Sequence, residues 1–394
     1  MQITTTLTLT AAEYSAFINS VADKVAALTV LPAPVPVPVP PPIPAPVPVP
    51  VPPPVPPPIP APLPVPTAGI DVLRAIEQLR VKSGNYTGMY LLAPAGYGNW
   101  YFANLGLMGA IPYMTPAELT TKVKPYLNLY ISKLRADYTI DDVEFPGGID
   151  FPQNVVTRVS DSDDSYGATI ASLALAYVNA SGDNAWWLAN SAVMEEIVIR
   201  NCVSQIKANN LTTTFTVTNV QKRWDIGYFM DNCEVYRGLR DIATLCRKTN
   251  VVKADYFDAA ASRVSAGLRA LWTGIGFRYA DALLKLRYPG TADPALLYPD
   301  GACQVFAQAF GVSELSDLYT PAYVYLNTNF PKWEAGTYDV FPFAVLSYVA
   351  ALRGNLEKSQ AHMTLMEQKF ALDRGKMTLN ELGWYARTRS LVRP

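Results

Sequence analysis

The sequence predicts an all-α fold for most of the chain, and two observations support this prediction. From residue 70 onward, about a dozen stretches repeat apolar residues at intervals of three and four, separated by loops rich in Gly, Pro and Asp. Some stretches are apolar nearly all round, such as ATIASLALAYV and VFPFAVLSYVAAL, whereas PAELTTKVKPYLNLYISKL is amphipathic. Buried and half-exposed helices that alternate along the chain indicate an inner ring of helices wrapped by an outer ring.

Loops with turn-forming residues set the bounds of the expected helices. These span Ile70–Val81, Asn99–Gly109, Pro116–Ala136, Ser165–Ala180, Asn184–Asn209, Tyr228–Thr249, Lys253–Leu271, Gly301–Phe310, Glu314–Asn329, Val340–Arg353, Leu356–Leu372 and Leu379–Arg389. Alternating aromatic residues between Gly276 and Pro289 favour one short β-hairpin between two helices. We therefore expect a single helical domain over residues 67–394.

The first 31 residues have a different pattern. Gln2–Leu9 alternates Thr with apolar residues, which predicts a short strand. Thr10 and Glu13 then form a capping box that opens an amphipathic helix ending at about Leu28. Residues 1–31 are too few to fold alone, so we expect this strand-helix anchor to dock on its own copies or on a larger assembly. An appendage without a partner is the alternative.

A proline-rich linker follows over residues 32–66. Of its 35 residues 21 are Pro, and the others are only Val, Ala, Ile and Leu. This composition is typical of a stiff polyproline II rod, which extends roughly 110 Å when fully stretched. Pro-rich segments can also bind aromatic grooves of signalling domains, but no Arg or Lys flanks this one, which favours a spacer.

Composition excludes several classes of protein. Lys and Arg number 32 against 33 Asp and Glu, without a basic run, so we do not expect nucleic acid as the main partner. The N-terminus has neither the basic region nor the apolar run of a secretory signal. Outside the proline-rich linker, no window of about 18 residues is apolar and uncharged, so we expect no membrane span.

The cysteines and the single histidine argue against a metal centre. Cys202, Cys233, Cys246 and Cys303 lack C-x-x-C spacing, and His362 has no second imidazole to share a metal or serve a triad. We expect four buried, reduced cysteines, with disulfides as the alternative. We expect no metal and no cofactor.

Three segments carry a family pattern. DSDDSYGATIASLALAYVNASGD spans Asp161–Asp183, RWDIGYFMDNCEVYRGLRDIA spans Arg223–Ala243, and YPDGACQVFAQAFGV spans Tyr298–Val312. In this order they resemble motifs of a poorly characterised bacterial branch of the six-hairpin glycosidase superfamily, and Asp163 stands where that pattern has Thr. The resemblance covers about residues 70–394 and implies an (α/α)6 toroid with a sugar-binding cleft. Residues 1–66 are not accounted for by it.

In a toroid of helical hairpins, loops at one end of the inner helices line a central cleft, so acidic residues just before apolar helices are candidate site residues. Asp161, Asp163 and Asp164 precede one such helix. Capping needs one carboxylate, so the surplus favours a site, and capping alone is the alternative. A calcium loop is not expected, because Tyr166 stands where Gly is needed and no bidentate Glu stands at the twelfth position of the loop.

Other carboxylates occupy comparable positions. Asp231 and Glu234 are three residues apart and share one face of a helix. Simple pairing with neighbouring cations is the alternative, the candidates being Arg223, Arg237 and Arg240. Asp300 precedes a helix and is otherwise a cap, and the same holds for Asp339, with Glu334 nearby.

Glycoside hydrolysis needs two carboxyl groups flanking the bond, one protonated and one ionised. We expect Asp164 to act with Asp231 or Glu234, and Asp300 is the reserve candidate. In an inverting enzyme the pair would stand roughly 6.5–9.5 Å apart.

Aromatic rings near expected loops suit stacking on sugars, although core packing is the alternative for each ring. The expected substrate-binding residues are Asp161, Tyr166, Trp100, Trp224, Tyr228 and Trp333, with Tyr97, Tyr101 and Tyr338 nearby.

Two functions are compatible with these observations. The first is a polysaccharide-degrading hydrolase, or less readily a lyase, tethered to a particle by the rod. The second is a non-catalytic glycan-binding or decoration protein of a virus particle or extracellular filament. The missing export signal favours a phage virion or an extracellular surface in both cases. Two carboxylates facing one open, aromatic-lined cleft would favour the enzyme, whereas salt bridges to Arg that close the cleft would favour the binder.

Overall fold

The computed structural model describes residues 69–94, 96–216, 226–282 and 296–392. Within these ranges the chain is mainly α-helical with two small sheets, which confirms the all-α prediction. The anchor expected over residues 1–31 and the rod expected over 32–66 lie outside the described residues, so both stay predictions.

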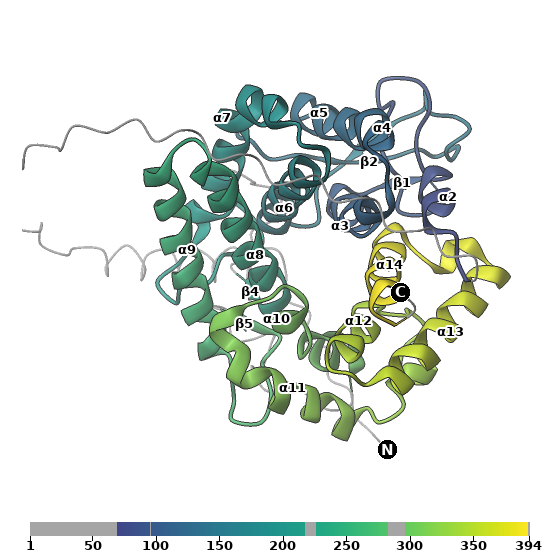
Figure 1. Cartoon of the computed structure of the whole chain (residues 1–394), viewed down its shortest axis with the longest axis vertical. Helices are drawn as coiled ribbons and strands as arrows, with labels where there is room; N and C mark the ends of the chain where they lie inside the picture. Colours follow the sequence, from purple (N-terminus) through teal and green to yellow (C-terminus); the bar gives the residue numbers. More distant parts are fainter. Residues whose placement is uncertain (1–68, 95, 217–225, 283–295, 393–394) are drawn as a thin grey trace, which may run out of the picture. The chain divides into compact units, whose positions relative to one another are not determined.

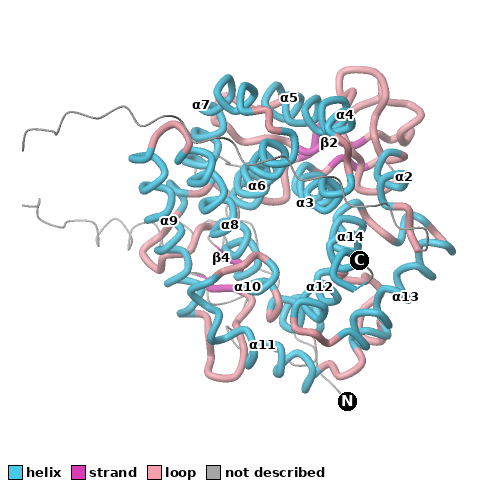
Figure 2. The backbone as a smooth tube through the Cα atoms, viewed as in Figure 1, coloured by secondary structure: helices cyan, strands magenta, loops and turns pink. Residues whose placement is uncertain are grey.

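Six of the described helices form an inner ring, as Figure 1 and Figure 2 show. They are α3 (Trp100–Ala110), α6 (Asp163–Ser181), α8 (Phe229–Arg247), α10 (Phe306–Ala309), α12 (Val345–Leu352) and α14 (Leu379–Val392). Each inner helix contacts the next one along the chain, and α14 returns to contact α3. The ring is therefore closed, which confirms the predicted toroid.

The remaining longer helices wrap the ring from outside (Figure 1). They are α2 (Val72–Glu77), the continuous run of α4 (Pro116–Glu118), η2 (Leu119–Val123) and α5 (Lys124–Ser132), then α7 (Asn184–Asn201), α9 (Val251–Ala270), α11 (Ser316–Asn329) and α13 (Leu356–Leu372). Short helical turns join them at η1 (Ile111–Tyr113), η3 (Val203–Gln205), η4 (Leu297–Gly301), η5 (Ser313–Leu315), η6 (Trp333–Ala335) and η7 (Arg374–Lys376). Inner and outer helices thus alternate along the chain, as the alternation of apolar and amphipathic stretches predicts.

The turn between α6 and α7 shows how the sequence reverses the chain. Gly182 ends α6 with a φ of 72°, a left-handed conformation that favours glycine. Asp183 follows at once and caps α7, its carboxylate accepting a hydrogen bond of 2.9 Å from the backbone N–H of Trp186. One Gly-Asp pair therefore stops the inner helix and starts the outer one.

Several expected helices are shorter than predicted; the one expected over Gly301–Phe310, for example, has its α-helix, α10, at Phe306–Ala309. The helix expected to run to Asn209 ends at Asn201, where the chain enters η3. The helix expected from Val340 begins at Val345, because Pro342 removes a donor and Phe343 takes a φ of 46°, which no α-helix allows. The five residues excluded from this helix are free to form a loop at the end of the ring.

Two small antiparallel sheets lie among the loops. One joins β1 (Tyr97–Gly98), β2 (Asp142–Glu144) and β3 (Val156–Arg158), with Tyr97 opposite Glu144 and Val143 opposite Thr157. The other pairs β4 (Ile226–Tyr228) with β5 (Ala280–Ala282). The hairpin expected between Gly276 and Pro289 therefore contributes one described strand, whose partner is β4 and not a neighbour within that run; residues 283–295 lie outside the described ranges.

Glycines close the ring where its last helix meets its first. A Cβ on Gly109 of α3 would lie 2.2 Å from the carbonyl oxygen of Gly383 of α14, and one on Gly383 would lie 2.7 Å from the Cα of Gly106. Gly238 of α8 approaches Ala168 of α6 in the same way, at 2.6 Å. The backbones touch only because these positions carry no side chain. Glycines in the sequence therefore allow the inner helices to pack closely.

The core fills the space between the two rings. Helices α6 and α12 bury residues on nearly all their faces, as their apolar composition predicts. The four cysteines are buried and unpaired, as expected. Among the residues that the structure describes, no helix combines the length and apolar character needed to cross a membrane.

Candidate active site

A cavity of about 900 Å³ opens at the end of the ring where several inner helices begin. Its walls are mostly aromatic: Tyr101, Phe102, Tyr166, Phe215, Tyr228, Tyr279, Tyr298, Phe306, Phe341, Phe343 and Trp384 line it. Three carboxylates line it as well, Asp161, Asp231 and Glu381. The cavity has the volume of a small-molecule site and the aromatic surface that suits a sugar ring.

The three carboxylates share one structural origin. Asp161 precedes Ser162, whose hydroxyl caps α6, and Asp231 and Glu381 stand in the first turns of α8 and α14. The positive end of a helix dipole favours a carboxylate at this position. Helices α8 and α14 lie on opposite sides of the ring's centre (Figure 1), and each contributes one acid, Asp231 or Glu381, to the lining of the cavity.

Asp231 is half-buried because it faces the cavity and protein encloses its other sides. Burial raises the pKa of this carboxyl well above its usual value, and the negative charges of Asp164 and Glu234 raise it further. Among the described residues no Lys or Arg lies within ion-pair distance of it. The protonated form of Asp231 is therefore favoured more than in an ordinary aspartate, which is the direction that a general acid requires.

Glu381 is 1% exposed, yet it belongs to the cavity wall. One oxygen accepts a hydrogen bond from the backbone N–H of Ala344, and the other accepts one of 3.1 Å from the amide of Asn380. Burial raises the pKa of this carboxyl to about 7, although the bond from Ala344 opposes the shift. Glu381 therefore has both a charged and a neutral form near neutral pH.

Asp164, the first of the expected catalytic residues, lies behind the wall and does not line the cavity. Its carboxylate accepts hydrogen bonds from the hydroxyl of Ser162 at 2.6 Å, the hydroxyl of Thr212 at 2.6 Å and the backbone N–H of Ser165 at 2.9 Å. Burial raises its pKa to about 6 against these bonds. These contacts match the capping alternative and fix the start of α6.

Glu234 also lies behind the wall, one helical turn after Asp231. Its Oε1 accepts a hydrogen bond of 2.6 Å from the hydroxyl of Tyr101, a ring that does line the cavity. Burial raises the pKa of Glu234 to about 8, in opposition to this bond. Glu234 therefore acts on the cavity through Tyr101.

A second buried carboxylate, Asp142 of β2, holds the other tyrosine of this wall. It accepts hydrogen bonds from the hydroxyl of Tyr166 at 2.8 Å, the hydroxyl of Tyr97 at 3.0 Å and the amide of Asn99 at 3.1 Å. Burial raises its pKa to about 7. The rings of Tyr101 and Tyr166 stack with centroids 6.1 Å apart, so two buried acids orient a pair of stacked tyrosines.

Of the other expected residues that the structure describes, Tyr101 and Tyr228 join Asp161, Tyr166 and Asp231 in the cavity wall. Trp100 and Trp333 are fully buried and do not line the cavity, which agrees with the core-packing alternative for both rings. Trp224 lies outside the described residues.

The remaining acids are also placed elsewhere. Asp300 is buried beside α10 and does not line the cavity. Glu334 pairs with Lys358 at 2.7 Å, and Asp339 accepts a hydrogen bond of 2.9 Å from the backbone N–H of Phe341. The structure therefore brings only part of the expected set to one site.

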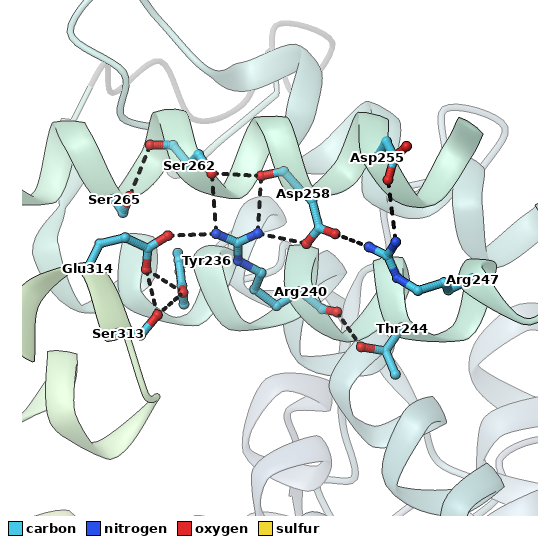
Figure 3. Close-up of polar contacts among 10 residues, drawn as sticks. All are labelled: Tyr236, Arg240, Thr244, Arg247, Asp255, Asp258, Ser262, Ser265, Ser313 and Glu314. Atoms are coloured by element: carbon cyan, nitrogen blue, oxygen red, sulfur yellow. Dashed lines mark hydrogen bonds and ion pairs between the residues drawn. The ribbon is translucent and has the colours of Figure 1, made fainter. Parts of the chain in front are cut away.

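The arginines that could have neutralised the site acids are engaged elsewhere. Arg237 binds Asp241 on its own helix at 2.7 Å. Arg240 binds Asp258 at 2.7 Å and Glu314 at 2.6 Å on the outer side of α8 (Figure 3). Arg223 lies outside the described residues. Salt bridges from Arg237 or Arg240 therefore do not close the cavity.

A third feature of the cavity is an aromatic shelf formed by Tyr298, Phe341 and Phe343. The rings of Tyr298 and Phe343 stack with centroids 5.4 Å apart and planes 10° apart, and Phe341 meets Phe343 edge-on at 4.9 Å. Tyr298 is 52% exposed, so part of its surface is available to a ligand. Within the described residues no group of three His, Cys, Asp or Glu side chains is placed to hold a metal ion.

No protein-family model matches the sequence, and no curated protein matches it either. Solved structures do share the fold. A rhamnosidase from Klebsiella oxytoca with rhamnose bound matches with a TM-score of 0.56 and 11% identity, over 83% of this chain and 66% of its own.

A glycosidase variant in complex with glucose matches with a TM-score of 0.52 and 12% identity, over 82% of this chain and 95% of its own. The wild-type glycosidase gives 0.51 and 10% over the same shares. These likenesses confirm the predicted six-hairpin toroid as the fold.

Proposed function

We propose that the protein is a glycoside hydrolase and that Asp231 and Glu381 form its catalytic pair. The observation that carries this proposal is that two carboxylates, borne by helices on opposite sides of the ring, line one aromatic-lined cavity without a cation partner among the described residues. Paired carboxylates flanking the scissile bond are what glycoside hydrolysis requires. The same arrangement distinguishes the enzyme from the non-catalytic alternative set out above.

The two carboxyl groups differ in the way that the reaction requires. Asp231, whose raised pKa favours the protonated form, donates its proton to the leaving glycosidic oxygen as the bond to the anomeric carbon breaks. Glu381, with a pKa of about 7, supplies the ionised partner. It takes the proton of the attacking water, or attacks the anomeric carbon itself when the two groups stand only about 5–5.5 Å apart. Asp161 is the third cavity acid and contacts substrate hydroxyls.

The residues behind the wall position this site. Glu234 and Asp142 hold the hydroxyls of Tyr101 and Tyr166, which leaves their rings facing the cavity in fixed orientations. Asp164 holds the start of α6 through Ser162. We assign these three acids to positioning, and Asp300 to neither role.

The solved structures with the same fold support a sugar as the ligand, because one is a rhamnosidase with rhamnose bound and another is a glycosidase in complex with glucose. The aromatic shelf offers the flat apolar surface on which a pyranose ring stacks. The substrate we propose is a polysaccharide or surface glycan.

The wider context of the proposal rests on the sequence. Residues 1–31 would dock the chain to a virion or another extracellular assembly, and the linker at 32–66 would hold the enzyme away from that surface. A particle-bound enzyme of this kind would act on the glycan coat of a cell.

The experiment that tests the proposal measures new reducing ends after incubation of the full chain with a panel of bacterial polysaccharides and aryl glycosides. We expect wild-type protein and the outer-face variant Asp258→Asn to release reducing ends from the same glycan, and Asp231→Asn and Glu381→Gln to lose at least about 10²-fold in rate. Binding of a glycan by the wild type without release of any reducing end would establish the non-catalytic alternative.

A further inference from the structure

A second charged cluster lies deeper in the ring than the catalytic pair. Arg237 follows Asp231 by six residues on α8, and Arg387 follows Glu381 by six residues on α14. Both helices start at the cavity end, so each arginine lies about 9 Å further along the axis of its helix. Neither arginine lines the cavity described above.

Arg387 is a half-buried cation without an anionic partner. Its guanidinium lies over the ring of Trp384, 4.4 Å from the centroid. Within the ranges that the structure describes, no carboxylate reaches ion-pair distance of Arg387 and no acceptor hydrogen-bonds it. The stack on Trp384 leaves the N–H groups at the edge of the guanidinium available to a ligand.

Arg237 adds a second positive charge near Arg387, and the nearby carboxylate of Asp241 is already paired with it. Its Nε and Nη2 bind the two oxygens of Asp241 at 2.8 and 2.7 Å, which occupies that carboxylate. Burial, together with the positive charge of Arg237, lowers the pKa of Arg387 to about 10, against the opposing effects of Tyr348 and Asp241. The Arg237 side chain is 48% exposed and Arg387 is half-buried, so solvent reaches this cluster, in which two guanidinium groups against one carboxylate leave a net positive charge.

We infer that Arg387, with Arg237 beside it, binds an oxyanion such as a carboxylate, sulfate or phosphate group on the inner side of Trp384. The planar guanidinium matches the geometry of these oxyanions and forms paired hydrogen bonds with them. Trp384 also lines the catalytic cavity, so one indole ring separates the two sites.

Two sources supply such a group: an acidic sugar of the glycan that reaches past Trp384, or a free inorganic anion. The inference stands on the charges of this cluster and does not require the catalytic assignment of Asp231 or Glu381.

Titration of the full chain with sodium sulfate, with sodium chloride holding the ionic strength constant, tests this site. We expect the thermal midpoint to rise with sulfate and then saturate, and the tryptophan fluorescence to change over the same concentrations. Arg387→Gln should weaken sulfate at least about tenfold. Arg353→Gln is the matched control, because Arg353 stacks on Tyr323 at 5.1 Å on another element, and it should bind sulfate like the wild type.

Competition experiments with glucuronate and glucose distinguish an acidic sugar from a free inorganic anion as the ligand. Competition of glucuronate but not glucose with sulfate supports an acidic sugar, and sulfate binding unaffected by glucuronate supports a free inorganic anion. Equal sulfate affinity in the wild type and Arg387→Gln, or no saturable response in the wild type, would overturn the inference. If Arg387→Gln does not fold, Arg387→Lys keeps the charge without the planar fork; wild-type sulfate affinity in that variant would equally overturn it.

Discussion

Helix α8 carries two polar clusters on opposite faces, and they are built in opposite ways. On its inner face Asp231 and Glu234 lie without an Arg or Lys partner among the described residues, and burial raises the pKa of both. On its outer face Arg240 and Arg247 bind three acids of α9 and η5 (Figure 3): Asp255, Asp258 and Glu314. The same helix therefore bears an unpaired acidic cluster and a paired ionic network.

The two clusters also differ in the charge state that the fold favours. In the outer network, burial of Glu314 would raise its pKa, but hydrogen bonds from Tyr236, Ser313 and Arg240 lower it, so the charged form is the stable one. In the inner cluster no such bonds prevail, and the protonated form is favoured. The outer network ties α8 to α9 and η5, whereas the inner cluster consists of buried acids with raised pKa values, a pattern that is common at functional sites.

The largest effect is expected from Asp231→Asn, which removes the proposed proton donor. Activity should fall by at least about 10²-fold, while the free energy of unfolding stays equal or rises, because Asn cannot ionise, whereas the Asp231 carboxyl ionises more readily in the unfolded state than in the folded one. Reducing-end release and urea unfolding measure the two quantities. A variant that loses stability and keeps its activity would show that Asp231 serves the fold, like the acids of the outer face, and not the reaction.

The second largest effect should be a change in the free energy of unfolding with pH, and the raised pKa of Glu234 determines its direction. The folded-state pKa of about 8 lies above the ordinary value of 4.5, so the folded state binds more protons between these two pH values. The unfolding free energy should therefore be greatest below about pH 4.5 for this group and fall as pH rises through 8. Glu234→Gln should remove on the order of 2 kcal/mol of this decline.

Chemical unfolding of wild type and Glu234→Gln at pH 5, 6.5 and 8 measures the decline. Parallel curves for the two proteins would show that Glu234 keeps an ordinary pKa. Glu314 provides the opposite sign, since its lowered pKa adds stability above the unfolded-state value that is lost as pH falls through the folded value.

A smaller loss of stability is expected from Arg240→Met on the outer face. The variant keeps most of the side-chain volume but releases Glu314 and leaves Asp258 paired with Arg247 alone, which should cost about 1–2 kcal/mol and leave activity within about twofold of the wild type. The midpoint of urea unfolding and the rate of reducing-end release report the outcome. Loss of activity at full stability would mean that the outer network also serves the site.

The smallest effect should come from Arg247→Ala. Arg247 is 50% exposed and its partner Asp255 is 67% exposed, so solvent screens this pair. We expect a loss of no more than about 0.5 kcal/mol, which 0.5 M sodium chloride should abolish. A larger, salt-resistant loss would show that the network acts as a unit.

The fold followed from the sequence because helical periodicity and the alternation of apolar and amphipathic stretches are local signals. Asp231 was predictable for a similar reason, since its place at the start of an inner helix is visible in the pattern. The choice between Asp161 and Asp164 was not predictable, because the exact start of α6 decides which acid faces the cavity. Ser162 caps that helix, which turns Asp164 into the protein and leaves Asp161 at the wall.

Two functional acids gave weaker signals. Glu381 sits in the first turn of α14, where its position next to the ring's axis depends on the closure of that helix against α3. Asp142 lies in a three-residue strand, and its contact with Tyr166 joins residues 24 apart in the chain. Such contacts depend on the assembled ring, and helical periodicity does not report them.

The central claim is that Asp231 and Glu381 act as one catalytic unit across the cavity. The most direct test is the rate of reducing-end release by the wild type, Asp231→Asn, Glu381→Gln and the double variant, on the same glycan and with folding checked by circular dichroism. We predict losses of at least about 10²-fold in each single variant and a double variant that loses little more than the worse of them. Wild-type rates in both single variants, or losses that multiply in the double variant, would contradict the claim.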